Sequence, residues 1–195
     1  LQTAITEANS MDTLKVKNNF VIKDPATNKV VIPSGKTITL DFNNKKVYAL
    51  VSNMTIASER RDFLQKLDCF ICNEIEAGIL FYDNYEDKEP EEMRDILAEK
   101  IKAANISSMI VTMGGKGAVY ADCNGVKGLV PAKKVAVKDT TGAGDAFCAG
   151  AMSGLTYGKS LEEAIQIGTT LAASVITSTD NVCPRFRPEE FGLNV

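Results

Sequence analysis

The stretch Asp139–Phe147 has residue types and spacing that suit a phosphate. It reads Asp-Thr-Thr-Gly-Ala-Gly-Asp-Ala-Phe, so Gly142, Ala143 and Gly144 directly precede Asp145 where a helix is expected to begin. Because glycine and alanine have little or no side chain, a phosphate can approach the unpaired amides of a helix N-terminus closely. Asp145 could take the proton of a hydroxyl that attacks the phosphate. The stretch therefore indicates phosphoryl transfer to an alcohol. The alternative is a glycine-rich turn before a helix.

Two further stretches follow buried apolar runs and carry polar or glycine residues. Asn73-Glu74-Ile75-Glu76 follows the run Cys69–Cys72. Its spacing also fits a helix cap with a reciprocal carboxylate three residues later. Val111–Ala118 ends in a Gly-Gly-Lys-Gly turn, which could equally be a simple hairpin turn. Lys116 is expected to be a solvated turn lysine, because the chain lacks the spacing of a phosphate-binding P-loop.

The residue types exclude several kinds of chemistry. The chain has no histidine, which removes Ser-His and Cys-His catalysis and the usual zinc sites. Its five cysteines are an odd number without regular spacing, which favours reduced thiols in the cytoplasm. Strand alternation would point Cys69 and Cys72 to opposite sides, so we interpret both as buried structural thiols.

Composition and charge narrow the class of protein. The 195 residues are 45% hydrophobic and 24% charged, as in an ordinary globular domain. A net charge of -3 without a long basic run argues against nucleic acid or a membrane surface as the main partner. We expect no membrane span and no signal segment. The acidic run 83–92 is expected to be a solvated loop rather than a calcium site.

Helix and strand patterns alternate through residues 54–195. Helices are expected at 58–67, 74–81, 90–104, 142–157 and 160–177, with strands at 69–72, 108–113, 117–121, 126–130 and 135–137. Such alternation predicts an α/β fold with a parallel sheet covered by helices. Residues 1–53 form a separate, β-rich segment, with a helix at 1–9 and strands at 20–22, 30–32, 37–40 and 47–51.

From about residue 58 to the C-terminus the chain resembles the PfkB/ribokinase family of carbohydrate kinases. Asp139–Phe147 is similar to the family signature, Asn73–Glu76 to its N-x-x-E motif, and Val111–Ala118 to its nucleotide turn. The resemblance implies a partial ribokinase-like fold, a three-layer sheet with helices on both faces, preceded by the β-rich segment. It implies ATP-dependent phosphoryl transfer to a hydroxyl of a sugar or nucleoside, with Mg²⁺ and, as in ribokinase-like members, K⁺. A homodimer is compatible with it.

The resemblance also assigns roles residue by residue. Asp145 would be the catalytic base, and the amides of Gly142, Ala143 and Gly144 the anion hole. Asn73 and Glu76 would order Mg²⁺ and the phosphates through water, Thr112, Gly114 and Gly117 would line the ATP cleft, and Thr169 would lie near adenine. Asp139 and Thr141, with carbonyls near 176–181, would bind the monovalent cation. Asp139 could instead only cap its turn, and the small residues 168–173 could serve tight helix packing instead of an adenine wall.

The N-terminal segment departs from the family pattern. Residues 1–53 carry no paired-glycine sugar motif and weakly resemble a rung of a bacterial surface β-helix protein, which needs neighbours to bury its faces. The chain could be a hybrid, a fragment of a longer kinase, or a kinase whose β-rich start replaces the lid. The alternative function is therefore a nucleotide-binding or structural remnant without transfer activity. A surface-repeat protein outside the cell is a third interpretation, disfavoured by the cysteines and the lack of an export signal.

Overall fold

The computed structural model describes residues 2–9, 11–15, 39–41, 46–50, 61–179 and 186–193. Contacts divide the chain into two units, Leu1–Lys46 and Val47–Val195.

The smaller unit contains helix α1 (Gln2–Glu7) and the parallel strands β1 (Thr13–Lys15) and β2 (Thr39–Asp41). Helix α1 confirms the helix expected at 1–9, β2 overlaps the strand expected at 37–40, and β1 was not predicted. The strands expected at 20–22 and 30–32 lie outside the described residues.

The larger unit is built on one mixed five-stranded sheet in the order β3-β4-β5-β6-β7. Its strands are β3 (Tyr48–Leu50), β4 (Cys69–Asn73), β5 (Ser108–Thr112), β6 (Ala118–Asp122) and β7 (Lys127–Val130). Strands β3, β4 and β5 are parallel, whereas β6 and β7 are antiparallel to their neighbours. Strand β3 precedes the boundary we placed at 53/54 yet pairs with β4. The separate origin of residues 1–53 stays a prediction.

The lengths of the connections explain the change of strand direction. Between β4 and β5 the chain has room for two helices, α4 (Glu74–Phe81) and α5 (Pro90–Ala104). Between β5 and β6 it has only the short 3-10 turn η1 (Gly114–Lys116) and its flanking residues, too few for a parallel crossover. The expected parallel pairing is therefore confirmed for β3 to β5 and wrong for β6 and β7.

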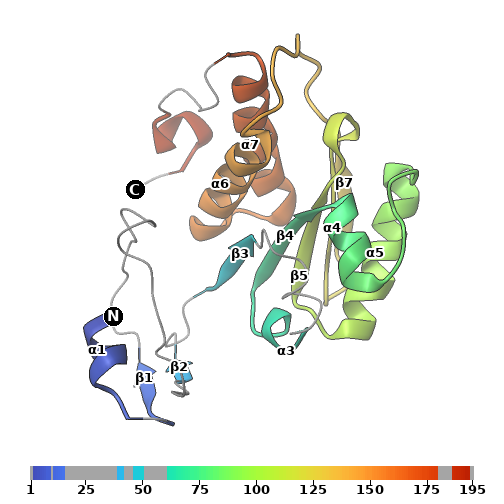
Figure 1. The fold of residues 1–195 in the computed structure, drawn as a ribbon. Coiled ribbons are helices and arrows are strands. Elements are labelled where there is room, and N and C mark those ends of the chain that lie inside the picture. The colour runs from blue at the N-terminus through green and yellow to red at the C-terminus, as the bar shows by residue number, and fades with distance from the viewer. Residues whose placement is uncertain are drawn as a thin grey trace. The chain divides into compact units, whose positions relative to one another are not determined.

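Two hydrophobic clusters cover the two faces of this sheet. Phe70 and Cys72 of β4 point into the cluster formed with α4 and α5, and Cys69 and Ile71 point into the cluster formed with helices α6 (Ala143–Thr156) and α7 (Leu161–Ile176). In Figure 1, α4 and α5 lie on one side of the sheet and α6 and α7 on the other. The predicted three-layer α/β fold is confirmed.

Most helices of the larger unit begin and end within a residue of the predicted bounds, because caps or breakers mark their ends. Ser160 and Glu163 form a capping box at the start of α7, in which each side chain accepts a hydrogen bond from the other residue's backbone amide. Helix α3 (Arg61–Leu64) falls in the helix expected at 58–67, of which residues 58–60 lie outside the described residues. The strand expected at 135–137 is wrong, since these exposed residues pair with no strand. A 3-10 turn, η2 (Pro188–Phe191), follows near the end.

Helices α6 and α7 approach each other closely because glycines lie at their contact. A Cβ on Gly168 would lie 2.6 Å from the carbonyl oxygen of Phe147, and one on Gly150 would lie 2.8 Å from the Cα of Gly168. Either contact is shorter than side chains tolerate, so the fold itself requires glycine at both positions. This contact holds α6, and with it the Gly142–Asp145 turn at its N-terminus, against α7.

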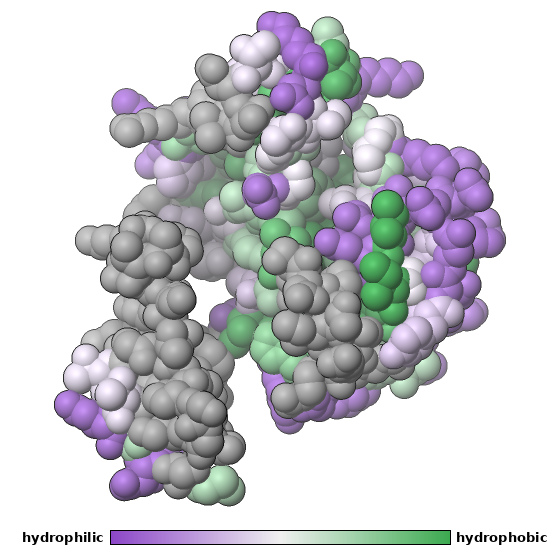
Figure 2. Space-filling view, in the orientation of Figure 1, coloured by the Kyte–Doolittle hydropathy of each residue, from purple (hydrophilic) through white to green (hydrophobic). Residues whose placement is uncertain are grey.

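Part of the surface of the larger unit is apolar. Ile75 and Ile79 of α4 and its C-cap residue Tyr82 are 54%, 47% and 76% exposed, respectively. Figure 2 shows hydrophobic atoms over α4 among hydrophilic neighbours. Among the residues that the structure describes, none of the helices combines the length and the apolar character needed to cross a bilayer.

Candidate active site

The N-terminus of α6 presents free backbone donors. Gly142, the N-cap residue, has φ 81°, and its carbonyl accepts from the amide of Ala146 at 3.0 Å. The Ala143 amide donates to the carbonyl of Thr140 at 3.2 Å. Within the described part of the chain, the amides of Gly142, Gly144 and Asp145 have no acceptor. Free donors at the positive end of a helix dipole suit an anion.

The space around Gly144 is open. A Cβ built on this residue would meet no atom within 4 Å, and its φ is not in the positive range. Neither packing nor backbone geometry within the described chain therefore accounts for glycine here, in contrast to Gly168. A group that binds closely over the N-terminus of α6 would account for it. Asp145 lies exposed in the first turn of the same helix.

The second motif lies where β4 and β5 end. Asn73 pairs with Thr112 across the two parallel strands, and the Thr112 hydroxyl donates to the Cys72 carbonyl at 3.5 Å. Because carboxyl ends of parallel strands share one edge of a sheet, the predicted Asn73–Glu76 and Thr112–Gly117 residues meet there.

Asn73 and Glu76 form the helix cap that the sequence left as an alternative. The Asn73 Oδ1 accepts from the Glu76 amide at 2.8 Å, and the Glu76 Oε2 accepts from the Asn73 amide at 2.9 Å. The cap uses only one side-chain atom of each residue. The Nδ2 of Asn73 and the Oε1 of Glu76 have no partner among the described residues. One carboxylate oxygen thus remains available for the water-mediated Mg²⁺ contact that the resemblance implies.

A buried thiol connects the two motifs. Burial, together with the carboxylates of Asp145 and Glu76, raises the pKa of Cys148 to about 12. Both carboxylates therefore lie near enough to act electrostatically on one thiol, although 69 sequence positions separate Glu76 from Asp145. Cys148 follows Asp145 by three residues on α6, a spacing that points both side chains to one face. This spacing is the sequence signal that identifies Cys148 as a neighbour of the candidate base.

The Gly114–Lys116 turn has open space beside Gly114 and Gly115, whereas Gly117, which follows it, is closely packed. Gly114 has φ 53°, and a Cβ on Gly114 or Gly115 would meet nothing within 4 Å. A Cβ on Gly117 would clash with the backbone of Val130 to Ala132, so the fold itself requires that glycine. Lys116 is partly exposed, and its Nζ donates to the Lys88 carbonyl at 2.9 Å and to Glu89 at 3.1 Å. Contact of Gly114 and Gly117 with a nucleotide stays a prediction.

The turn before α6 is closed by Asp139. Its Oδ1 accepts from the Thr141 amide at 2.9 Å, and this bond lowers the pKa of the Asp139 carboxyl. The neighbouring Lys138 amide donates to the Ile176 carbonyl at 2.7 Å, which brings the end of α7 to this turn. The capping alternative is thus present. Part of the expected carbonyl set, at 180–181, lies outside the described residues. Across the described ranges, no group of three or more Cys, Asp or Glu side chains is arranged to hold a metal.

The remaining predicted positions are placed as follows. Gly168 is accounted for by helix packing, and Thr169, next to it on α7, is buried. Adenine contact at Thr169 stays a prediction.

Cys69 and Cys72 are buried, free and on opposite faces of the sheet, as predicted, and burial raises the pKa of the Cys69 thiol to about 11. In the acidic run 83–92, Lys88 pairs with Glu92 at 2.6 Å and Lys100 with Asp83 at 3.2 Å.

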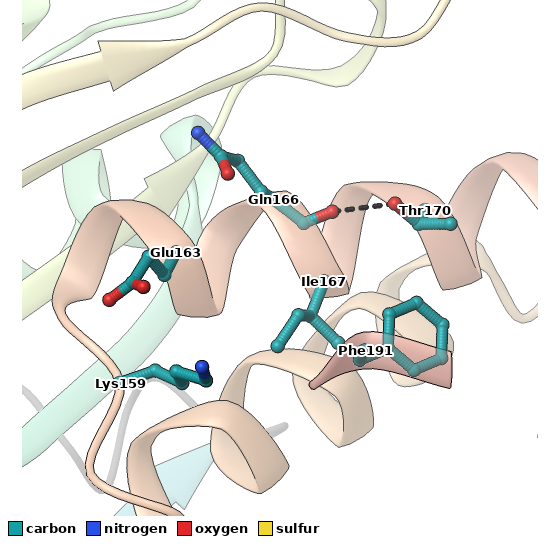
Figure 3. Close-up of a pocket in the computed structure, with 6 residues that line it drawn as sticks. All are labelled: Lys159, Glu163, Gln166, Ile167, Thr170 and Phe191. Atoms are coloured by element: carbon teal, nitrogen blue, oxygen red, sulfur yellow. Dashed lines mark hydrogen bonds between the residues drawn. The ribbon is translucent and has the colours of Figure 1, made fainter. Parts of the chain in front are cut away.

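A cavity of about 240 Å³ lies elsewhere on the larger unit, between α7 and η2. Figure 3 shows its lining by Lys159, Glu163, Gln166, Ile167, Thr170 and Phe191. None of these is a predicted site residue. Lys159 follows the C-terminal end of α6, about 20 Å along that helix from Gly142 at 1.5 Å per residue. The cavity is separate from the candidate active site.

Comparison with known proteins identifies the family. A profile of the pfkB family carbohydrate kinases matches residues 36–183. The chain belongs to this family. The match begins inside the segment 1–53, further towards the N-terminus than the motifs alone indicate.

Individual relatives agree with this assignment. Guanosine-inosine kinase of Exiguobacterium acetylicum is 36% identical over 138 residues, which are 69% of this chain and 44% of that protein. Ribokinase of Schizosaccharomyces pombe is 29% identical over 59% of this chain and 36% of that protein. Among solved structures, a probable sugar kinase from Rhizobium etli has a TM-score of 0.58 at 28% identity, over 77% of this chain and 46% of that one. The chain therefore spans less than half the length of these relatives.

Proposed function

We propose that this pfkB family chain carries out ATP-dependent phosphoryl transfer to a hydroxyl of a sugar or nucleoside. The observation that carries the proposal is the N-terminus of α6, where free backbone amides and the exposed Asp145 carboxylate lie in the same helical turn. The partly free carboxylate of Glu76, at the end of β4, acts electrostatically on Cys148 of the same helix. Phosphoryl transfer depends mainly on placing such charges and donors around the phosphate.

Each group then has a role that suits its chemistry. The free amides of Gly142, Gly144 and Asp145 stabilise negative charge on the transferred phosphoryl group. The exposed Asp145 carboxylate accepts the proton of the attacking hydroxyl and orients its oxygen. Asn73 and the free oxygen of Glu76 hold water around Mg²⁺, which when bound neutralises phosphate charge. Thr112 and the Gly114–Lys116 turn line the nucleotide side, with adenine near Thr169.

We propose only the chemical class of the acceptor, a sugar or a compound that contains ribose. The similar proteins named above are a guanosine-inosine kinase, a ribokinase and a probable sugar kinase, so a ribose-containing or sugar acceptor fits all three. A monovalent cation at Asp139 and Thr141, a homodimer and a place in the cytoplasm belong to the same proposal. The reduced, buried thiols suit that compartment.

A second candidate is nucleotide binding without transfer. The observation that favours it is that residues 1–53 carry no paired-glycine sugar motif. The part of such a kinase that meets the acceptor is not recognisable in residues 1–53. On this alternative, ATP binds at the α6 N-terminus and no acceptor is turned over.

The test combines ATP calorimetry with acceptor-dependent ADP release over a panel of sugars and nucleosides. Asp145→Asn should lower turnover by about 10²- to 10⁴-fold and change ATP affinity little. Glu91→Gln is the matched control, since Glu91 is also an exposed first-turn carboxylate, on α5, and it should leave turnover unchanged. Full turnover in Asp145→Asn would refute the catalytic role. ATP binding without turnover of any acceptor would favour the second candidate.

A further inference from the structure

Lys116 joins the Gly114–Lys116 turn to the beginning of α5. Its Nζ donates to the Lys88 carbonyl at 2.9 Å and lies 3.1 Å from the Glu89 Oε1. Glu89 is the N-cap residue of α5, directly before Pro90. The lysine thus bridges residues 27 and 28 positions away in the chain. A lysine with a carbonyl and a carboxylate as partners is already engaged within the protein.

The open side of the turn, at Gly114 and Gly115, has few other restraints. Its backbone bonds are local, from the Lys116 amide to the Met113 carbonyl at 3.0 Å and from the Gly117 amide to the Gly114 carbonyl at 3.2 Å. Gly114 and Gly115 have no side chains, and nothing lies within 4 Å of where a Cβ would be. Side-chain packing therefore does not fix the direction of the turn on that side. The Lys116 bridge is a long-range contact that restrains this open side, whereas the other end of the turn is held where Gly117 packs against the backbone of Val130 to Ala132.

The other end of the bridge is rigid. Met93, Leu97 and Ile101 of α5 are fully buried in the core cluster, so α5 is anchored on the sheet. A second ion pair of the same kind joins the β6–β7 hairpin to α5. In this pair the Nζ of Lys127, on β7, lies 2.9 Å from the Oδ1 of Asp95. That pair lies on a strand and does not involve the turn. It therefore provides a matched control for the loss of one lysine and one ion pair.

We propose that Lys116 is a positioning residue that fixes the Gly114–Lys116 turn through Lys88 and Glu89 and thereby sets nucleotide affinity. The inference rests on the proposed function, in which this turn contacts ATP. In this proposal the Lys116 ammonium group interacts with Lys88 and Glu89 of the protein and does not contact a phosphate directly. A surface bridge of this kind has a modest effect, roughly fivefold on a local equilibrium.

The first measurement uses the nucleotide-free chain. Hydrogen exchange of residues 113–118 should be roughly fivefold faster in Lys116→Met than in the wild type and unchanged in Lys127→Met. Lys116→Arg keeps a donor of similar reach and should restore most of the protection. Equal exchange in Lys116→Met and Lys127→Met would overturn the proposal. This readout does not depend on ATP binding, so it separates a failure of the bridge from a failure of the proposed function.

The second measurement is ATP binding and turnover. Lys116→Met should weaken ATP binding by roughly fivefold and leave kcat within about twofold, and Glu89→Gln should weaken binding in the same direction by less. A direct phosphate contact gives another pattern, in which Lys116→Met lowers kcat and Glu89→Gln leaves binding unchanged or tighter. That pattern would overturn the proposal. A wild type that binds no ATP would refute the proposed function, and the exchange measurement would then decide about the bridge alone.

Discussion

Asn73 and Thr112 face each other across β4 and β5, at the last paired position of the two parallel strands. One residue begins the turn into α4, and the other begins the turn into β6. The sheet therefore places the Asn73–Glu76 motif and the Thr112–Gly117 motif at adjacent strand ends.

Replacing Gly144 with alanine should separate stability from activity. The new Cβ has open space, and alanine favours helix over glycine, so the free energy of unfolding should stay equal or rise by up to about 1 kcal/mol. The same methyl group would occupy the space over the free amides, so phosphoryl transfer should fall at least tenfold. Urea unfolding and ADP release measure the two effects. A stable variant with undiminished turnover would show that no ligand approaches Gly144.

Replacing Gly168 with alanine should have the opposite effect on stability. The Cβ would lie 2.6 Å from the Phe147 carbonyl oxygen, so α6 and α7 must move apart. Overpacking of this kind costs about 1 to 3 kcal/mol. Thermal unfolding of Gly168→Ala and Gly144→Ala side by side measures the contrast. Equal melting temperatures would contradict the close α6–α7 contact.

The capping box allows the structural and chemical roles of Glu76 to be separated. Glutamine can still accept the Asn73 amide, so Glu76→Gln should change stability by less than about 0.5 kcal/mol. Its loss of charge should raise the Mg²⁺ concentration needed for half-maximal turnover severalfold. Asn73→Ala removes the cap acceptor and should destabilise the chain by about 1 kcal/mol. If Glu76→Gln keeps the wild-type Mg²⁺ dependence, Glu76 acts only as a cap.

The buried thiols predict a loss of stability at high pH. The pKa of Cys148 is raised from 9.0 to about 12 in the folded chain, so between these values the unfolded chain binds fewer protons than the folded one. The contribution of Cys148 to the free energy of unfolding is fully present below pH 9. It falls as the pH rises towards 12, by up to about 1.4 kcal/mol per pH unit. Urea midpoints from pH 8 to 11 should fall less steeply for Cys148→Ala than for the wild type. Parallel curves would contradict the linkage.

The sequence predicted elements best where caps and breakers mark them. Pro90, the Asn73–Glu76 box and the Ser160–Glu163 box set the starts of three helices, and these local signals need no tertiary information. The apolar runs before Asn73 and Thr112 likewise identified β4 and β5. The antiparallel direction of β6 follows from the shortness of the turn before it, which the alternation of helix and strand patterns does not indicate.

Tertiary effects explain what the sequence left open. The strand expected at 135–137 has a β-branched pattern, but no neighbouring strand pairs with it. Gly117 and Gly168 belong to glycine-rich motifs, yet only packing shows that the fold already requires glycine there, whereas packing does not require glycine at position 144. The Lys116 bridge joins residues that no short motif relates.

The mixed direction of the sheet also affects the order of folding. Strands β5, β6 and β7 are joined by short turns, so their contacts close small loops, whereas the pairing of β4 with β5 must close a loop of more than thirty residues. Local contacts form faster on average than distant ones. We therefore expect the Gly114–Lys116 turn to form with the β5–β6 hairpin early in folding. The N-terminus of α6 and the end of β4 would come together around it later.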